Sequence, residues 1–276
     1  MQEVPELREI LDKAIQFAAS MHEGQYRKGT RIPYISHPYA VAMLLLSYGY
    51  RAELVIAGLL HDVLEDTSAT YDEVVQLFGV QVAQLVDAAS EPDKSLLWKE
   101  RKDHTLETLK VAPMDVKVLV CADKLHNLRS ILADLETIGE AVWGRFHSGV
   151  KHSGSEAQIW YYTGILHSLY ANLPYERDMP IFSAYRKEVL MLRRWGKKVM
   201  DVESSFGGDE ALHWIFHYIE SAYRETGEIP SDLNADDLQA GLYVLSNVGI
   251  QDWGTNDRLE RALLGHIRKR TVRQIE

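Results

Sequence analysis

An apolar run that ends in a cluster of ionisable residues is the feature that most constrains the fold of this chain. Residues 54–60 have the composition of a buried helix, and four ionisable residues follow almost at once: His61, Asp62, Glu65 and Asp66. Unpaired charge away from water costs several kcal/mol or forces a pKa shift. A bound cation removes that cost, and an imidazole beside a carboxylate suits a borderline or hard divalent ion. We therefore predict that His61 and Asp62 are metal ligands.

Two neighbouring ligands are too few for a metal site, so further ligands must come from other parts of the chain. His37 precedes Pro38, which suits the first position of a helix, so we expect His37 at the helix cap. Asp123 lies on the apolar face of a predicted helix, where a carboxylate needs a partner. The resulting metal quartet is His37, His61, Asp62 and Asp123. Two nitrogen and two oxygen donors leave coordination positions open for water and substrate.

Ordinary structural roles are the alternatives for these residues. His37 could simply cap its helix, and Asp123 could pair with Lys124 or Arg129. His126 lies toward the edge of the same predicted helix, and we expect it to be an ordinary polar residue outside the metal quartet.

Two carboxylates follow the central pair of ligands at helical spacing. Glu65 lies one turn beyond His61, and Asp66 lies one turn beyond Asp62. Carboxylates just past a metal site are suited to general acid and base chemistry. The alternative is a plain helix end, but anionic side chains are unfavourable at a helix C-terminus. We therefore predict that Glu65 and Asp66 are catalytic.

Most of the chain shows the 3.6-residue periodicity of helices, with glycine and proline between the segments. We expect helices over residues 7–21, 37–47, 52–64, 71–78, 80–90, 94–109 and 114–135. Thr70 and Glu73 form a capping box that opens the fourth of these. No pair of alternating strands is evident, so we predict an all-α fold, a helical bundle followed by a helical extension.

A polar stretch with two prolines, residues 172–180, predicts a domain boundary. We expect a first domain over residues 1–175 that holds every candidate site residue, and an extension over residues 176–276. Helical patterns in the extension cover residues 182–202, 209–223, 235–245 and 256–270. We expect the extension to stabilise, oligomerise or regulate the first domain and to supply no metal ligand, and a homo-oligomer stays possible.

Composition excludes several classes of function. The chain has 276 residues, a net charge of −10 and a pI near 5.6, which argues against nucleic-acid binding. No apolar stretch approaches the ~20 residues that span a bilayer. The single cysteine, Cys121, allows no intrachain disulfide, and the acidic start differs from a signal peptide. We therefore expect a cytoplasmic protein with neither nucleic acid nor membrane as a partner.

Several segments, taken in order, resemble the RelA/SpoT-type HD-domain hydrolases, and more closely the stand-alone small alarmone hydrolases. The matching segments are residues 26–38, 61–67, 122–129, 143–146 and 160–162. Many HD-superfamily phosphohydrolases share the metal quartet, but far fewer add an Arg-Lys pair upstream and a Glu-Asp pair directly after it. The resemblance covers roughly residues 5–173 and implies an HD-domain helical bundle.

This resemblance implies an activity and a cofactor. The metal quartet would hold one Mn²⁺ ion, and Glu65 and Asp66 would serve the hydrolytic step. The reaction would remove the 3′-pyrophosphate of guanosine tetra- or pentaphosphate, (p)ppGpp, and give GDP or GTP plus pyrophosphate. Arg27 and Lys28 match the family's nucleotide-contacting pair, and Asn127 matches an asparagine near the sugar-phosphate.

A nucleotide with two pyrophosphates is densely anionic, so an acidic chain must gather positive charge locally to bind it. Lys99 and Arg101 lie in a basic segment ahead of the helix that carries Asp123. We add them to Arg27, Lys28 and Asn127 as candidate substrate-binding residues. The alternative for this segment is an exposed amphipathic helix with balancing acids.

Three other functions use parts of the same site. Another HD-superfamily nucleotidase or phosphodiesterase would keep the metal quartet but need neither the Arg-Lys nor the Glu-Asp pair. The nucleotide (p)ppApp, or NADPH, would use the same machinery with a different purine pocket. A non-catalytic nucleotide sensor would usually have lost the carboxylates that this chain retains.

Overall fold

The computed structural model describes residues 4–91, 95–146, 154–173 and 179–195, together with a few isolated positions further along the chain. Within these four ranges the regular secondary structure is helical, apart from an isolated antiparallel β-bridge between Tyr26 and Pro33. The predicted all-α fold is thereby confirmed. No helix in the described part of the chain is long and apolar enough to cross a membrane.

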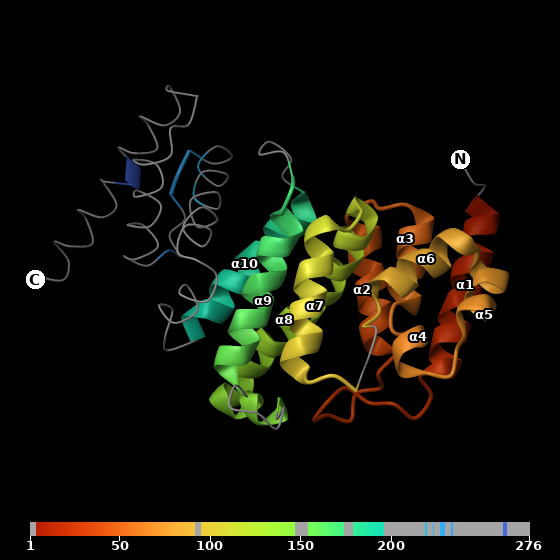
Figure 1. Cartoon of the computed structure of the whole chain (residues 1–276), viewed down its shortest axis with the longest axis horizontal. Coiled ribbons are helices and arrows are strands. Elements are labelled where there is room, and N and C mark those ends of the chain that lie inside the picture. The colour runs from red at the N-terminus through yellow and green to blue at the C-terminus, as the bar shows by residue number, and fades with distance from the viewer. Residues whose placement is uncertain are drawn as a thin grey trace, which may run out of the picture. The chain divides into compact units, whose positions relative to one another are not determined.

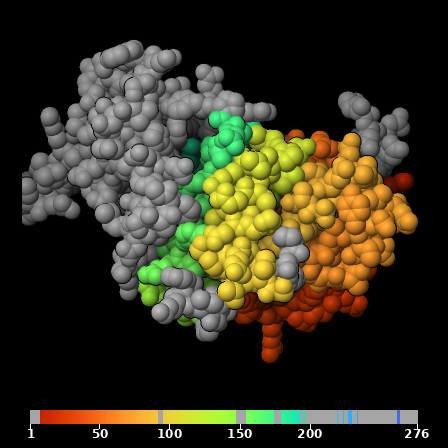
Figure 2. Space-filling view, viewed as in Figure 1, coloured from red at the N-terminus to blue at the C-terminus, as the bar shows by residue number. Residues whose placement is uncertain are grey.

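Ten α-helices and one 3-10 helix make up the described ranges (Figure 1). They are α1 (Val4–Met21), α2 (Ser36–Ser47), α3 (Ala52–Leu60), α4 (Val63–Asp66), α5 (Tyr71–Phe78), α6 (Val80–Ala89), α7 (Trp98–Val111), α8 (Met114–Ile138), η1 (Gly139–Arg145), α9 (Ser155–Tyr170) and α10 (Pro180–Trp195). In the space-filling view, α7 shares one face with α5 and α6, and the loop before α2 forms the lower edge (Figure 2).

The centre of the bundle is α3, which packs against α1, α2, α6 and α8. All of residues 54–60 are buried, as the apolar run predicts. Gly58 lets α2 and α3 approach closely, since a Cβ atom there would lie 2.7 Å from Leu45 Cδ1 and 3.3 Å from Ala42 Cα. This close packing fixes the last turn of α3, after which the ionisable cluster begins, against the second half of α2.

Two details at this centre differ from the prediction. The helix expected over residues 52–64 is interrupted: α3 ends at Leu60, and α4 begins at Val63. In α2 the helix begins at Ser36 with Ile35 as its cap, so His37 lies inside the first turn and is not the capping residue. Both changes place ligand candidates at helix ends, where side chains from different helices meet. The capping box of Thr70 and Glu73 is confirmed.

The longest helix, α8, carries Asp123 and packs against α2, α9 and α10. One of its buried residues is a lysine. Lys117 Nζ donates hydrogen bonds to the carbonyl oxygens of Ser168, Leu169 and Ala171 at 3.1, 3.3 and 2.7 Å. The ammonium group therefore satisfies carbonyls at the C-terminal end of α9, where a positive charge also suits the helix dipole.

The chain divides into two compact units, Met1–Lys197 and Lys198–Glu276. The first unit extends beyond the boundary expected at residue 175, because α10 packs on α8 and α9. Ile181, Phe182 and Tyr185 of α10 are fully buried. The helix expected over 182–202 corresponds in part to α10, and the three later helices expected in the extension lie outside the described residues.

Candidate metal centre and active site

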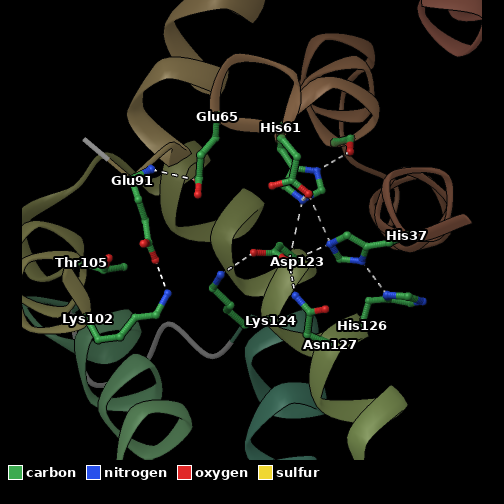
Figure 3. Close-up of polar contacts among 12 residues, drawn as sticks. His37, His61, Glu65, Glu91, Lys102, Thr105, Asp123, Lys124, His126 and Asn127 are labelled. Carbon is green, nitrogen blue, oxygen red and sulfur yellow. Dashed lines mark hydrogen bonds and ion pairs between the residues drawn. The ribbon is translucent and has the colours of Figure 1, made fainter. Parts of the chain in front are cut away.

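The side chains of His37, His61 and Asp123, which come from different helices or helix ends, converge near the start of α2 and the end of α3 (Figure 3). One ligand atom from each of His37, His61 and Asp123 lies within 4.8 Å of the others. Asp62 Oδ2 is 3.0 Å from His61 Nε2 and 3.7 Å from His37 Nε2. The structure therefore brings together the whole predicted metal quartet. His37, His61 and Asp123 are buried, with exposed fractions of 1%, 4% and 8%.

The orientation of His61 suits a cation. Its Nδ1 donates a hydrogen bond to the Gly58 carbonyl at 2.9 Å, so Nε2 is the atom that faces the carboxylates. Nε2 is buried and forms no hydrogen bond of acceptable geometry with the described residues, although Asp62 Oδ2 lies only 3.0 Å away. A buried polar atom that is left without a hydrogen bond calls for an explanation such as an ion. The donor set of two imidazoles and two carboxylates also fits a borderline divalent metal.

The electrostatics of the quartet are those of a tightly coupled cluster. Burial lowers the pKa of His37, which favours the neutral imidazole that binds metals. Burial acts on Asp62 in the opposite direction, but His61 and His37 hold the pKa of this carboxyl below its ordinary value. Burial also acts against ionisation of Asp123, yet Lys124 and His37 keep its pKa well below the ordinary value. Both carboxylates are therefore ionised and available as oxygen donors.

The sequence left open that Asp123 pairs with a nearby cation in place of a metal ion, and Lys124 is such a partner. Lys124 Nζ lies 2.7 Å from Asp123 Oδ2. The other oxygen, Oδ1, is 3.1 Å from His37 Nε2 and 3.8 Å from His61 Nε2. The ion pair and a metal site are therefore compatible, because they use different oxygens.

Residues that sequence reasoning left out support the quartet from outside. The Tyr34 hydroxyl donates to Asp62 Oδ2 at 2.6 Å, and His126 Nδ1 lies 2.7 Å from His37 Nδ1. His126, which we expected to lie outside the metal quartet, therefore contacts one of its members. Burial, with His37 next, lowers the pKa of His126 to about 4, so its imidazole is neutral near pH 7. No sequence signal marks these contacts, which depend on how the loop before α2 and helix α8 pack.

The predicted catalytic carboxylates lie in the same cavity as the quartet. Glu65 Oε2 accepts a hydrogen bond from the backbone N–H of Glu91 at 3.1 Å. Burial raises the pKa of Glu65, and the negative charge of Glu91 acts in the same direction. A carboxylate with a raised pKa is a better proton acceptor near neutral pH. Asp66 also lines the cavity, and its backbone N–H donates to the Asp62 carbonyl at 2.8 Å, one helical turn back.

Basic side chains line one side of this cavity, and Glu91 holds two of them. Arg101 Nη1 lies 2.8 Å from Glu91 Oε2, and Lys102 Nζ pairs with Glu91 Oε1 (Figure 3 shows the lysine pair). Glu91 and Lys102 were not among the predicted site residues. The nearby positive charges of Lys102 and Lys124 outweigh burial and lower the pKa of Glu91. The cavity therefore contains two cations, Arg101 and Lys102, that are paired with the carboxylate of Glu91.

The predicted substrate-binding residues divide into two groups. Arg27, Arg101 and Asn127 line the cavity. Asn127 connects two parts of the site, since its Oδ1 accepts from Arg27 Nη2 at 2.8 Å and its Nδ2 donates to Asp123 Oδ1 at 2.6 Å.

Lys28 and Lys99 are not among the residues that line the cavity. Lys28 Nζ lies over the Phe146 ring, 5.8 Å from its centroid. Lys99 Nζ lies 3.9 Å from the centroid of the Trp160 ring and also pairs with Asp103. Both side chains thus contact aromatic rings that are not among the residues lining the cavity.

The all-helical bundle and the His-His-Asp-Asp cluster define a class of protein, and residues 14–143 match the HD domain family. The pyrophosphohydrolase MESH1 of Mus musculus is 41% identical over 122 residues, 43% of this chain and 68% of that protein. MESH1 of Danio rerio is 38% identical over 125 residues, 44% of this chain and 69% of that protein. The bifunctional (p)ppGpp synthase/hydrolase SpoT of Escherichia coli is 41% identical over 127 residues, 44% of this chain but only 18% of SpoT.

Solved structures agree with these relatives. The crystal structure of lmo0812 from Listeria monocytogenes has a TM-score of 0.52 at 39% identity, over 57% of this chain and 99% of that one. A metazoan SpoT orthologue described as hydrolysing ppGpp has a TM-score of 0.53 at 26% identity, over 67% of this chain and 95% of that one. The chain belongs to the family of HD-domain proteins that includes SpoT and MESH1.

Proposed function

We propose that this protein is a metal-dependent pyrophosphohydrolase that removes the 3′-pyrophosphate of (p)ppGpp and releases GDP or GTP plus pyrophosphate. One observation carries the proposal: the metal quartet, two further carboxylates and a set of basic side chains line a single cavity. The MESH1 relatives, which this chain matches over more than two thirds of their length, are named as guanosine-3′,5′-bis(diphosphate) 3′-pyrophosphohydrolases. Both lines of support point to the same substrate class.

The metal quartet would hold one divalent cation, and we propose Mn²⁺ as the physiological ion. Such a cation supplies Lewis-acid stabilisation of the negative charge that develops on the phosphoryl oxygens. The mixed nitrogen and oxygen donor set supports a transition metal over Mg²⁺, which prefers oxygen donors. His61 Nε2 is buried and faces the carboxylates of Asp62 and Asp123 at 3.0 and 3.8 Å, which supports a ligand role for His61.

Glu65 is the proposed general base. Its half-buried carboxylate, with a raised pKa, would accept a proton from the attacking water. The water oxygen joins the pyrophosphate phosphorus, the bond from that phosphorus to the ribose 3′-oxygen breaks, and a proton passes to the 3′-oxygen. Asp66, one turn from Asp62, would assist in orienting the water.

Arg101 and Lys102 would bind the pyrophosphate, because phosphate oxygens accept the same charge-assisted hydrogen bonds that these cations now make to Glu91. Arg27 and Asn127, which are hydrogen-bonded to each other in the cavity, would bind another part of the nucleotide. Lys28 and Lys99 remain candidates only for the outer part of a nucleotide, since neither lines the cavity.

We propose a cytoplasmic location, in keeping with a free buried cysteine at position 121. The chemistry is assigned to the first compact unit, Met1–Lys197, which contains every proposed site residue. The rest of the chain is proposed to stabilise, oligomerise or regulate that unit.

A substrate screen tests the proposed function. Hydrolysis of ppGpp, pppGpp, (p)ppApp and NADPH would be followed by anion-exchange chromatography with Mn²⁺, with Mg²⁺ and with EDTA. We expect pyrophosphate release from (p)ppGpp with Mn²⁺ and none with EDTA. The Asp123→Ala variant, which lacks one proposed ligand, serves as the control and should be inactive. Faster turnover of (p)ppApp or NADPH would keep the mechanism but replace the substrate. Tight nucleotide binding without turnover in any mixture would favour a sensor.

A further inference from the structure

His126 lies next to the metal-ligand candidate His37 and contacts its ring (Figure 3). The Nδ1 atoms of the two rings are 2.7 Å apart, and the ring centroids are 4.9 Å apart at an interplanar angle of 32°. The other nitrogen of His37, Nε2, faces Asp123 Oδ1 at 3.1 Å. His37 thus has one nitrogen in the proposed metal centre and the other against His126.

The chemistry of imidazole links these two contacts. A neutral imidazole that binds a cation through Nε2 must carry its proton on Nδ1. Metal-binding histidines almost always donate that N–H to an acceptor, usually a carboxylate, a carbonyl or water, and the acceptor fixes the ring and its tautomer. At His37 the atom in hydrogen-bonding position is the Nδ1 of a second imidazole.

We propose that His126 is a positioning residue for the metal centre: its Nδ1 accepts the Nδ1–H of His37 and so fixes the tautomer whose Nε2 lone pair faces the cation. This inference rests on the proposed function. It requires His126 to carry its own proton on Nε2.

Helix α8 explains why this support is precise. Asp123, His126 and Asn127 occupy positions i, i+3 and i+4, which lie on one face of a helix. The same turn therefore delivers a ligand candidate, the acceptor for His37, and an amide that donates to Asp123 Oδ1 at 2.6 Å. A shift of the helix would move all three together, so the tautomer of His37 and the position of Asp123 are set by one rigid element.

The test is the Mn²⁺ affinity of metal-free protein, measured by electron paramagnetic resonance as free Mn²⁺ is taken up. His126→Leu fills most of the space but offers no acceptor, and we expect binding 10- to 100-fold weaker, the usual cost of losing an outer partner. His126→Asn places an oxygen close to the former Nδ1 and should restore most of the affinity. His104→Leu, at an exposed histidine of α7, is the matched control and should bind as the wild type does. Circular dichroism checks that each variant is folded.

The tautomer is read directly in the wild-type protein. Nitrogen-15 shifts of the histidine rings, recorded with diamagnetic Zn²⁺ bound, should show His37 protonated on Nδ1 and His126 protonated on Nε2. A His37 ring protonated on Nε2 would overturn the proposal. So would wild-type affinity in His126→Leu, or equal losses in the Leu and Asn variants. A wild-type protein that takes up no Mn²⁺ would overturn the metal centre itself, and this inference with it.

Discussion

Replacing Glu65 by Gln separates proton transfer from folding and binding. Glu65 Oε2 accepts a hydrogen bond from the backbone N–H of Glu91 at 3.1 Å, and the amide oxygen of glutamine keeps that bond in the same volume. The variant should therefore fold normally, keep the cavity and bind Mn²⁺. What it loses is a carboxylate able to accept a proton.

The size of the effect follows from that single loss. General base catalysis contributes about 10²- to 10⁴-fold, so kcat should fall at least ~10²-fold, about 2.7 kcal/mol of transition-state stabilisation. KM and Mn²⁺ affinity should stay close to the wild-type values. Because burial raises the pKa of Glu65, wild-type kcat should fall with decreasing pH at values above the ~4.3 of an ordinary glutamate. This acidic limb should disappear in the variant.

Initial rates of pyrophosphate release from ppGpp, measured across pH at saturating Mn²⁺, give both quantities. Glu107→Gln on the exposed face of α7 controls for the loss of one surface charge. A Glu65→Gln enzyme with wild-type kcat and an unchanged acidic limb would refute the role of this carboxylate.

Lys117→Met leaves the three carbonyls at the end of α9 without their donor. The free energy of unfolding, measured by urea denaturation, should fall by about 1–3 kcal/mol. An unchanged midpoint of the urea transition would contradict the capping role of Lys117. Glu91→Gln removes the anion paired with Arg101 and Lys102, so inorganic pyrophosphate should inhibit ppGpp hydrolysis more strongly than in the wild type. Weaker inhibition would show that Glu91 is required to hold these two cations in position. A chain ending at residue 197 should keep its helicity and its turnover, whereas one ending at 175 lacks α10 and should melt at a lower temperature. Equal melting temperatures of these two chains would show that α10 adds little to the first unit.

The central site was predictable because its signals are local. His61 and Asp62 are adjacent in sequence, and they follow an apolar run whose burial makes unpaired charge unfavourable. Asp123 is recognisable for the same reason, as a carboxylate in an otherwise apolar stripe of α8. Grouping these residues into one quartet rested on the chemistry of their donors, and the family resemblance supported the grouping, because periodicity alone does not place one helix beside another.

The supporting contacts were not predictable because they join distant parts of the chain. The residues of the His37–His126 contact are 89 positions apart, and those of the Tyr34–Asp62 contact are 28 apart. Each pair is defined by packing in three dimensions, and neither residue type is unusual for a loop or a polar helix face.

Two helices show the limits of pattern reading. Helix α9 was not predicted, because it is buried on nearly all sides and its sequence lacks a polar face. The prolines near residue 175 were interpreted as a domain boundary, but Pro180 is the first residue of α10, a position that proline favours. The stretch therefore connects two helices of one compact unit.

The most direct test of the proposed function is the identity of the products. Purified protein with Mn²⁺ and ppGpp, with the products separated by anion-exchange chromatography, should give GDP and inorganic pyrophosphate in equal amounts, and EDTA should stop the reaction. Release of orthophosphate in place of pyrophosphate, or full activity in excess EDTA, would contradict the account.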